Sequence, residues 1–255
     1  MKDQNFPNPI QAKKRDAWQP YTIVIPAHNE ENFLPQTLSA LASSFESIGH
    51  PGQIVVVNDD SDDATREVAL KHEVTVIDVQ LRNIGAVRNA GAKACQTPWL
   101  FFLDADTLLP AQTLAAALDQ LAGGAVGGGA AVEIDPQQKI SILKWAMFYA
   151  IKISWQSIAG WAAGCFMFCR KDTFDSFGGF DETFFAAEEL FFSRAVSRRG
   201  RFALLRQPVL TSARKLEAYS TSELIRFVTL PIMRPGTLLK SRSGLELLYD
   251  DRKAR

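Results

Sequence analysis

Three short apolar runs, each ending abruptly in polar residues, constrain the fold of this chain more than any other feature. They span residues 22–25, 54–57 and 99–103, and helical patterns lie between them. One such pattern is an apolar stripe from Leu34 to Ile48, at steps of three and four residues. Continuous apolar strands separated by helices are typical of a parallel sheet that helices cover on both faces. The sequence therefore predicts an α/β fold with a Rossmann-like, mostly parallel central sheet.

The remaining elements follow the same alternation in the first half of the chain and a less regular one in the second. The expected helices span residues 64–71, 85–94, 111–122, 140–158 and 188–199, and the expected strands span 74–79, 130–134 and 165–169. Two glycine clusters, 123–124 and 127–129, precede the strand at 130–134. We expect these glycines to lie outside that strand, as part of the connection to it.

Composition excludes several classes of protein. The 255 residues are 47% hydrophobic and 22% charged, which is ordinary for a globular protein. The 28 basic and 28 acidic residues balance, which argues against a dedicated nucleic-acid binder. Three cysteines do not make a disulfide scaffold and favour a reducing compartment. We find neither a signal peptide at residues 1–20 nor a spanning helix, and we expect a cytoplasmic protein.

The balanced total conceals an uneven distribution of charge. Residues 194–255 contain 14 basic and 5 acidic residues, a net charge of +9, and the preceding residues carry −9. We divide the chain into a polar N-terminal arm (1–20), a main α/β domain (21–215) and a basic helical tail (216–255). The tail includes a predicted helix at 222–230 with apolar and basic residues. Such a helix either contacts an anionic membrane surface peripherally, at its inner face, or covers the sheet while its arginines are solvated.

The polar residues after the three apolar runs are the first candidates for a site. Parallel strands bind ligands at their carboxyl ends, so the segments after residues 25, 57 and 103 line one crevice. Asp104 and Asp106 follow the third run, where carboxylate oxygens can hold a hard divalent cation. The alternative is a turn in which an Asp side chain caps the helix that opens at Pro110.

Two further clusters follow along the chain. Residues 58–65 hold four aspartates in five positions; some cap a helix, and one is a candidate for accepting hydrogen bonds from a base or ribose. In the segment 82–91, Gly85 permits close approach of an anion at a helix start, and Arg88 is placed to reach a nucleotide. The alternative for the second cluster is a surface arginine beside a packed glycine.

Four motifs occur in an order and spacing that resemble the family 2 glycosyltransferases of the GT-A fold. They are Ile-Val-Ile-Pro-Ala-His-Asn-Glu-Glu at 23–31, Asn-Asp-Asp-Ser at 58–61, Asn-x-Gly-x-x-Arg-Asn-x-Gly at 83–91, and Asp-x-Asp at 104–106. The resemblance covers residues 21–107 clearly and continues more weakly to Gly200, through Gly-Gly-Phe-Asp-Glu at 178–182. It divides the domain into a nucleotide-sugar-binding half (21–107) and an acceptor half (108–215).

The resemblance implies an inverting, divalent-metal-dependent enzyme of the hexosyltransferase type. The donor would be a nucleoside diphosphate sugar, with UDP expected as the nucleotide, and the acceptor a hydroxyl of a glycan or a lipid-linked molecule. The residues that it assigns to the nucleotide cleft are Pro26, Ala27, Asn29 and Glu30. Asp59 would bind the nucleobase, with Arg88 nearby. Asp104 would touch the ribose or a metal-bound water, and Asp106 would hold Mg²⁺ or Mn²⁺ against the diphosphate.

The family's acidic catalytic pair corresponds to Glu188 and Glu189, and the resemblance makes Glu189 the general base. A carboxylate close to the acceptor hydroxyl can take its proton during attack on the anomeric carbon. The alternative is an acidic first helical turn that interacts with the helix dipole. The chain departs from the family pattern at Asn58 and Asp60, which replace Asp and Gly. No histidine follows residue 72, and Arg214 and Lys215 stand where some relatives place a metal-ligand histidine. We expect these two cations to help bind the diphosphate, and the alternative is a solvated basic turn.

Two other functions remain open from the sequence. A nucleotidyltransferase-like enzyme that handles sugar nucleotides would use the same fold, but it predicts a glycine-rich, lysine-bearing loop after the first strand, where this chain has Pro-Ala-His-Asn-Glu. A non-catalytic module that binds nucleotide sugars is favoured if Asp106 or Glu189 lies far from the cleft.

Overall fold

The computed structural model describes residues 16–136, 141, 144, 162–184, 188–214 and 217. The helices expected at 140–158 and 222–230 and the extent of the N-terminal arm and tail therefore lie outside the described residues. No helix of the described part of the chain is both long enough and apolar enough to cross a membrane.

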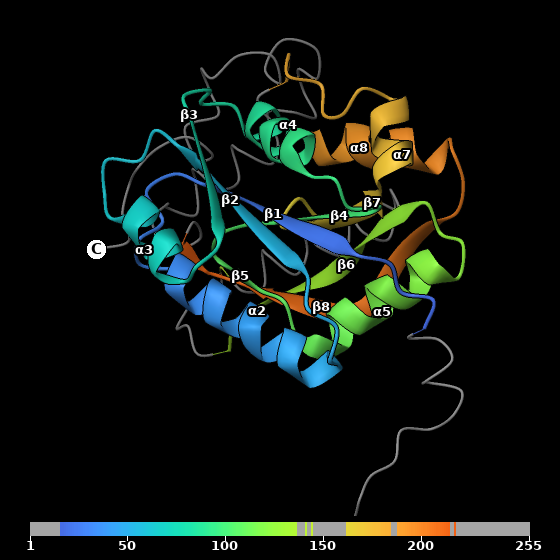
Figure 1. The fold of residues 1–255 in the computed structure, drawn as a ribbon, viewed down its shortest axis with the longest axis horizontal. Coiled ribbons are helices and arrows are strands. Elements are labelled where there is room, and N and C mark those ends of the chain that lie inside the picture. The colour runs from blue at the N-terminus through green and yellow to red at the C-terminus, as the bar shows by residue number, and fades with distance from the viewer. Residues whose placement is uncertain are drawn as a thin grey trace, which may run out of the picture.

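One mixed sheet of eight strands forms the centre of the molecule (Figure 1). Its order is β3 (Thr75–Val79), β2 (Gln53–Asp59), β1 (Tyr21–Ala27), β4 (Trp99–Leu103), β7 (Phe166–Arg170), β6 (Gly127–Ile134), β8 (Phe202–Thr211) and β5 (Thr107–Leu108). The first four strands are parallel. Strand β7 is antiparallel to both neighbours, β6 and β8 are parallel, and β5 is antiparallel to β8. This α/β architecture confirms the fold class expected from the sequence.

Helices cover both faces of the sheet, as expected. Figure 1 shows α2 (Leu34–Ile48), α3 (Thr65–Lys71) and α5 (Ala111–Ala122) on one side, and α4 (Ile84–Ala94), α7 (Lys171–Ser176) and α8 (Glu188–Ser197) on the other. Neighbouring residues of one strand enter different cores: Ile23 belongs to the first and Val24 to the second. Burial on both faces explains why the strands are continuous apolar runs.

The glycine cluster at 127–129 lies inside strand β6, which begins three residues before the expected start. A Cβ atom on Gly128 would come within 2.0 Å of the Ala203 carbonyl oxygen, and one on Gly129 within 2.3 Å of the Ala162 Cβ. These glycines therefore permit close backbone approach within the sheet, and the prediction that they only connect to the strand was wrong.

Three elements of the second half were not expected from the sequence: α7, the two-residue strand β5, and β8. Strand β8 alternates buried and exposed residues irregularly, contains Pro208, and carries a register shift against β6 between Ala130 and Ala131. A proline and a bulge break the alternation by which a strand is recognised in sequence. Strand β8 nevertheless matters for the site, because Ser212 and Arg214 directly follow it.

Candidate active site

The loops that follow β1 and β2 are locked together by side-chain-to-backbone hydrogen bonds. Asn29 has a positive φ of 56°, its amide donates to Ser61 Oγ (3.1 Å), and its Oδ1 accepts from the Asp62 amide (3.0 Å). The Glu30 amide donates to Thr65 Oγ1 at 2.7 Å. Pro26 and Ala27 are the last residues of β1 and are buried. The structure thus places these four predicted cleft residues at the carboxyl edge of the sheet.

Asp59 fixes the neighbouring loop after β3. Its Oδ1 accepts a hydrogen bond from the Leu81 amide (2.7 Å), and the Arg82 amide donates to its Oδ2 (2.9 Å). Asp59 is buried, so its side chain is held rigidly at this edge. The next residue, Asp60, has a φ of 56°. Asp is among the residues that tolerate this left-handed conformation, which explains how it can stand where the family pattern has glycine.

Arg82 and His28 form a contact that the sequence reasoning missed. Arg82 also has a positive φ (50°), and its Nη1 contacts His28 Nε2. The other ring nitrogen of His28, Nδ1, donates to the Asp59 carbonyl oxygen at 2.7 Å. The only available signal was the position of Arg82, which opens the motif that contains Gly85. This contact joins the loops after β1 and β3.

Helix α4 holds the segment 180–184 through two asparagines. Asn83 caps the helix by accepting from the Ala86 amide (2.9 Å), and its Nδ2 donates to the carbonyl of Phe184 (3.1 Å). Asn89 pairs with the Phe180 backbone in both directions, as donor to its carbonyl and acceptor from its amide, each at 2.9 Å. The motifs at 83–91 and 178–182, separate in sequence, therefore form one unit.

Arg88 lies at the centre of the site and is only 2% exposed. Its Nη1 donates to Glu188 Oε1 (2.7 Å), and its Nη2 donates to Asp104 Oδ1 (2.8 Å) and to the Gly164 carbonyl (2.9 Å). The guanidinium also lies over the Phe180 ring, 5.6 Å from its centroid. The structure thus brings Asp104 and Glu188 together through one buried cation, which neither sequence spacing nor periodicity indicated.

Glu189 follows Glu188 in the first turn of α8 and differs from it in environment. Burial, together with the negative charge of Glu188, raises the pKa of Glu189 to about 8, against the opposing effect of Arg88. A carboxyl with such a pKa is poised to exchange a proton near neutral pH. Glu188, in contrast, is held by the ion pair with Arg88.

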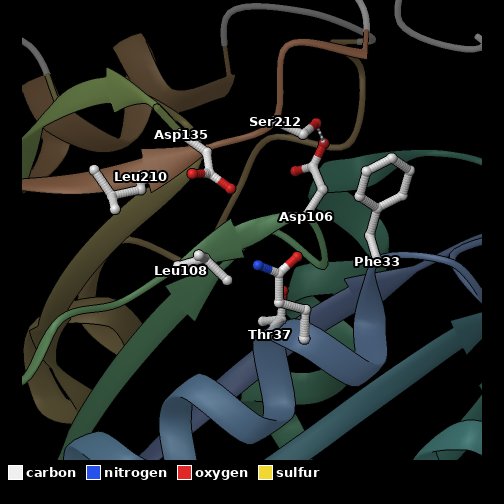
Figure 2. A pocket seen from close by; sticks show the side chains of 8 residues that line it. Phe33, Thr37, Asp106, Leu108, Asp135, Leu210 and Ser212 are labelled. Atoms are coloured by element: carbon white, nitrogen blue, oxygen red, sulfur yellow. Dashed lines mark hydrogen bonds between the residues drawn. The ribbon is translucent and has the colours of Figure 1, made fainter. Parts of the chain in front are cut away.

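Asp106 is held by two residues that follow strand β8. Its Oδ2 accepts a hydrogen bond from Ser212 Oγ at 2.5 Å, the contact drawn in Figure 2, and lies 3.0 Å from Arg214 Nε. Arg214 also donates to both carboxylate oxygens of Glu30, with Nη1 2.7 Å from Oε2. Its guanidinium lies 4.8 Å from the centroid of the Phe33 ring. Lys215, predicted beside it, lies outside the described residues.

A small pocket lies next to Asp106, between the start of α2 and the end of β8 (Figure 2). Its lining residues are Phe33, Gln36, Thr37, Asp106, Leu108, Asp135, Leu210 and Ser212. Its free volume of about 10 Å³ corresponds to roughly one water molecule. The pocket therefore brings Asp135, which the sequence reasoning did not single out, to the same small space as Asp106.

The donor set fits a divalent metal ion. Asp104 and Asp106 supply carboxylate oxygens, the ligands that Mg²⁺ and Mn²⁺ prefer. Within the described residues, no group of three or more His, Cys, Asp or Glu residues is arranged to hold a metal. Mg²⁺ in nucleotide enzymes is commonly bound through one or two carboxylates together with substrate phosphates. Asp104 and Asp106 therefore suit an ion that binds together with a diphosphate.

The fold is that of an α/β domain with an acidic edge at the carboxyl ends of its parallel strands, and comparison with known proteins gives its family. The protein-family model described as "Glycosyl transferase family 2" matches residues 22–177. The chain therefore belongs to glycosyl transferase family 2, as its motifs indicated.

Curated relatives agree over about two fifths of the chain. An uncharacterized glycosyltransferase of Mycobacterium bovis is 32% identical over 104 residues, covering 41% of this chain and 44% of the relative. An undecaprenyl-phosphate 4-deoxy-4-formamido-L-arabinose transferase of Pseudomonas fluorescens is 33% identical over 101 residues, covering 36% and 29%. The matched region thus spans less than half the length of these relatives.

Solved structures extend the similarity of fold to most of the chain. A mannosyltransferase of Pyrobaculum calidifontis, in complex with GDP-Man and Mn²⁺, has a TM-score of 0.62 at 17% identity, covering 86% of this chain and 66% of that one. The glucosyl-3-phosphoglycerate synthase of Mycobacterium tuberculosis, in complex with Mn²⁺, UDP and glucosyl-3-phosphoglycerate, has a TM-score of 0.59 at 14% identity, covering 87% and 81%. The chain has the GT-A fold of these glycosyltransferases.

Proposed function

We propose that this chain transfers a hexose from a UDP-linked sugar to an acceptor hydroxyl, with inversion at the anomeric carbon and with the help of a divalent metal. The observation that carries the proposal is the buried guanidinium of Arg88, which joins Asp104 to Glu188. This contact supports the proposal because it connects a candidate donor-binding carboxylate, Asp104, to the acidic pair that contains the candidate general base. A single displacement needs the bound donor and the general base next to each other. The solved neighbours with bound UDP or GDP-Man and Mn²⁺ support the choice of donor class.

On the donor side, we assign the nucleotide to the carboxyl edge of β1, β2 and β4. Asp59 binds the base, Asp104 the ribose, and Arg214 with Lys215 the diphosphate. The remaining cleft residues are Pro26, Ala27, Asn29 and Glu30. An Mg²⁺ or Mn²⁺ ion held by Asp106 would neutralise the charge that develops on the leaving diphosphate.

On the acceptor side, we assign the general base to Glu189. Its carboxyl has a pKa of about 8, so a substantial fraction is anionic and able to accept a proton at mildly alkaline pH. Glu188 is committed to Arg88 and holds that cation in place. Arg88 thereby acts as a positioning residue that connects the two sides of the site. This arrangement is unnecessary for a non-catalytic binding module.

The acceptor is a hydroxyl of a glycan or of a lipid-linked molecule. A lipid-linked acceptor agrees with the excess of basic residues after Arg194 and with a cytoplasmic protein at the inner face of the membrane. Sedimentation with vesicles that contain anionic lipid, at low and high salt, tests this part. Binding that is lost at high salt supports a peripheral contact. Absence of binding at low salt would leave a soluble acceptor.

The reaction itself is tested by incubating the full chain with a panel of UDP- and GDP-linked hexoses and measuring release of the nucleoside diphosphate. We expect release from a UDP-linked sugar with Mn²⁺ and little with EDTA. Asp106→Asn should lose both release and UDP binding, whereas Glu189→Gln should lose release alone. Donor binding without release under any condition, with every acceptor tried, would instead favour a binding module.

A further inference from the structure

Arg214 lies where two carboxylates of the proposed donor site converge. Both of its terminal nitrogens contact Glu30, and its Nε contacts Asp106 Oδ2. The Arg214 side chain is 24% exposed, and those of Glu30 and Asp106 are 10% and 11% exposed. In such partly buried surroundings, a cation beside a carboxylate is screened much less than at the surface. Arg214 therefore neutralises the carboxylate that we assign to the metal.

The same oxygen of Asp106 also accepts a hydrogen bond from Ser212. A divalent ion that arrives alone would meet a guanidinium about 3.0 Å from that oxygen. Like charges at such separations repel strongly outside bulk water. Divalent metal and Arg214 thus compete for Asp106 in the free protein.

A diphosphate changes this competition. Guanidinium groups bind phosphate oxygens in the same two-pronged geometry that they use with carboxylates. A nucleoside diphosphate beside Asp106 offers Arg214 an alternative anion and offers the metal additional oxygen ligands. Arg214 remains close to this place because Phe33 and Glu30 hold its guanidinium.

From these contacts we infer that Arg214 is a resident counter-ion of Asp106 that changes partner from Asp106 to the diphosphate when nucleotide and metal bind. This inference rests on the proposed function. Its consequence is positive cooperativity: the nucleotide raises the affinity for metal, and the metal raises the affinity for nucleotide by the same factor.

The test is a titration of the full chain with Mn²⁺, followed by the electron paramagnetic resonance signal of free Mn²⁺, with and without UDP. In the wild type we expect UDP to raise the affinity for Mn²⁺ by about tenfold or more. Arg214→Gln removes the competing charge, so its Mn²⁺ affinity without UDP should rise by about tenfold and the effect of UDP should shrink. Arg214→Lys keeps the positive charge but lacks the two-pronged guanidinium. Its Mn²⁺ affinity and its UDP effect should lie between those of the wild type and Arg214→Gln.

Arg201→Gln is the matched control, because it removes the same charge from the other end of β8. Arg201 contacts Gln120 Oε1 and the Gly123 carbonyl, away from Asp106. The Arg201→Gln variant should bind Mn²⁺ with the same affinity as the wild type. Thermal unfolding of each variant verifies that it is folded.

The outcomes separate this inference from the proposed function. Loss of Mn²⁺ binding in Asp106→Asn, with wild-type Mn²⁺ affinity and wild-type UDP coupling in both Arg214 variants, would overturn the inference and leave the metal assignment intact. Wild-type Mn²⁺ binding in Asp106→Asn would overturn the metal assignment, and the inference with it. UDP binding that Mn²⁺ does not strengthen in the wild type would also overturn the inference.

Discussion

Arg88 Nη1 lies 2.7 Å from Glu188 Oε1, and this buried ion pair gives Glu188 a different environment from that of the adjacent Glu189. Glu188 serves as a partner of Arg88, and its negative charge contributes to the raised pKa of Glu189. The proposed division between a structural carboxylate and a reacting carboxylate rests on environment rather than on residue type.

We expect Glu189→Gln to abolish sugar transfer while UDP binding stays close to that of the wild type and stability, measured at about pH 5, does not fall. The substitution keeps the shape of the side chain but removes its ability to accept a proton. Glu188→Gln is the comparison: loss of one partner of a buried ion pair should lower the free energy of unfolding by about 3 kcal/mol. Chemical denaturation and a transfer assay measure the two effects. Wild-type turnover in Glu189→Gln would place the base elsewhere.

The pH dependence of transfer should report the raised pKa of Glu189. A base reacts in its anionic form, so kcat/KM should rise with pH toward an inflection near 8, by about 50-fold between pH 6 and pH 8. The charged groups that act on Glu189 are Glu188 and Arg88, which oppose one another. Any residual activity of Glu189→Gln should lack this limb. A rate that is constant from pH 5.5 to 8.5 would contradict the assignment.

The same shift predicts how stability depends on pH. The folded-state pKa of Glu189 is raised above the unfolded value of 4.5, so the folded protein binds more protons between these two values. The contribution of Glu189 to stability is therefore fully present below about pH 4.5 and is lost as pH rises through about 8. The melting temperature of Glu189→Gln relative to that of the wild type should increase from pH 5 to pH 9. A constant difference would argue against the raised pKa of Glu189.

Asn89 should contribute to stability far more than an exposed amide does. Its side chain makes two hydrogen bonds to the Phe180 backbone and one to Glu182. Asn89→Ala should lower the free energy of unfolding by about 1–3 kcal/mol, because buried backbone groups lose their partners. Gln80→Ala, which removes one exposed bond to Asp60, should change it by less than about 0.5 kcal/mol. Equal losses of unfolding free energy for the two variants in urea denaturation would contradict this role of Asn89 in holding the Phe180 backbone.

Gly128 should tolerate no side chain at all. A Cβ there would meet the Ala203 carbonyl oxygen at 2.0 Å, and backbone atoms cannot move aside easily. Gly128→Ala should cost about 3 kcal/mol or prevent folding. Gly123 has a φ of −76°, and a Cβ there would lie 3.1 Å from the Asp119 carbonyl oxygen. Gly123→Ala should therefore lower the free energy of unfolding by less than about 1 kcal/mol. Similar melting temperatures for the two variants would refute the close approach of β6 and β8.

The first half of the fold was predictable because β1, β4 and most of β2 are buried on both faces and appear as apolar runs. The expected run at 99–103 coincides with β4, and the expected helix at 111–122 coincides with α5. Strand β8 was not predictable, since Pro208 and the bulge near Ala131 interrupt its pattern.

The contacts within the site were less predictable than its members. Family motifs singled out Asp106, Glu30 and Arg214, but only folding brings together residues 30, 106 and 214 of the chain. Ser212 is a common residue in no recognisable motif, so nothing in the sequence indicated its hydrogen bond to Asp106. Similarly, the resemblance assigned the base to Glu189, but nothing in the sequence indicated that Glu188 pairs with Arg88.

Calorimetric titration of UDP into the full chain tests the central claim most directly, that the edge of β1, β2 and β4 binds a nucleoside diphosphate with a metal at Asp106. We predict that UDP binds in the presence of Mn²⁺, that EDTA strongly weakens the binding, and that Asp106→Asn abolishes the effect of the metal. Tight binding of UDP that is unchanged by EDTA and by Asp106→Asn would contradict the account.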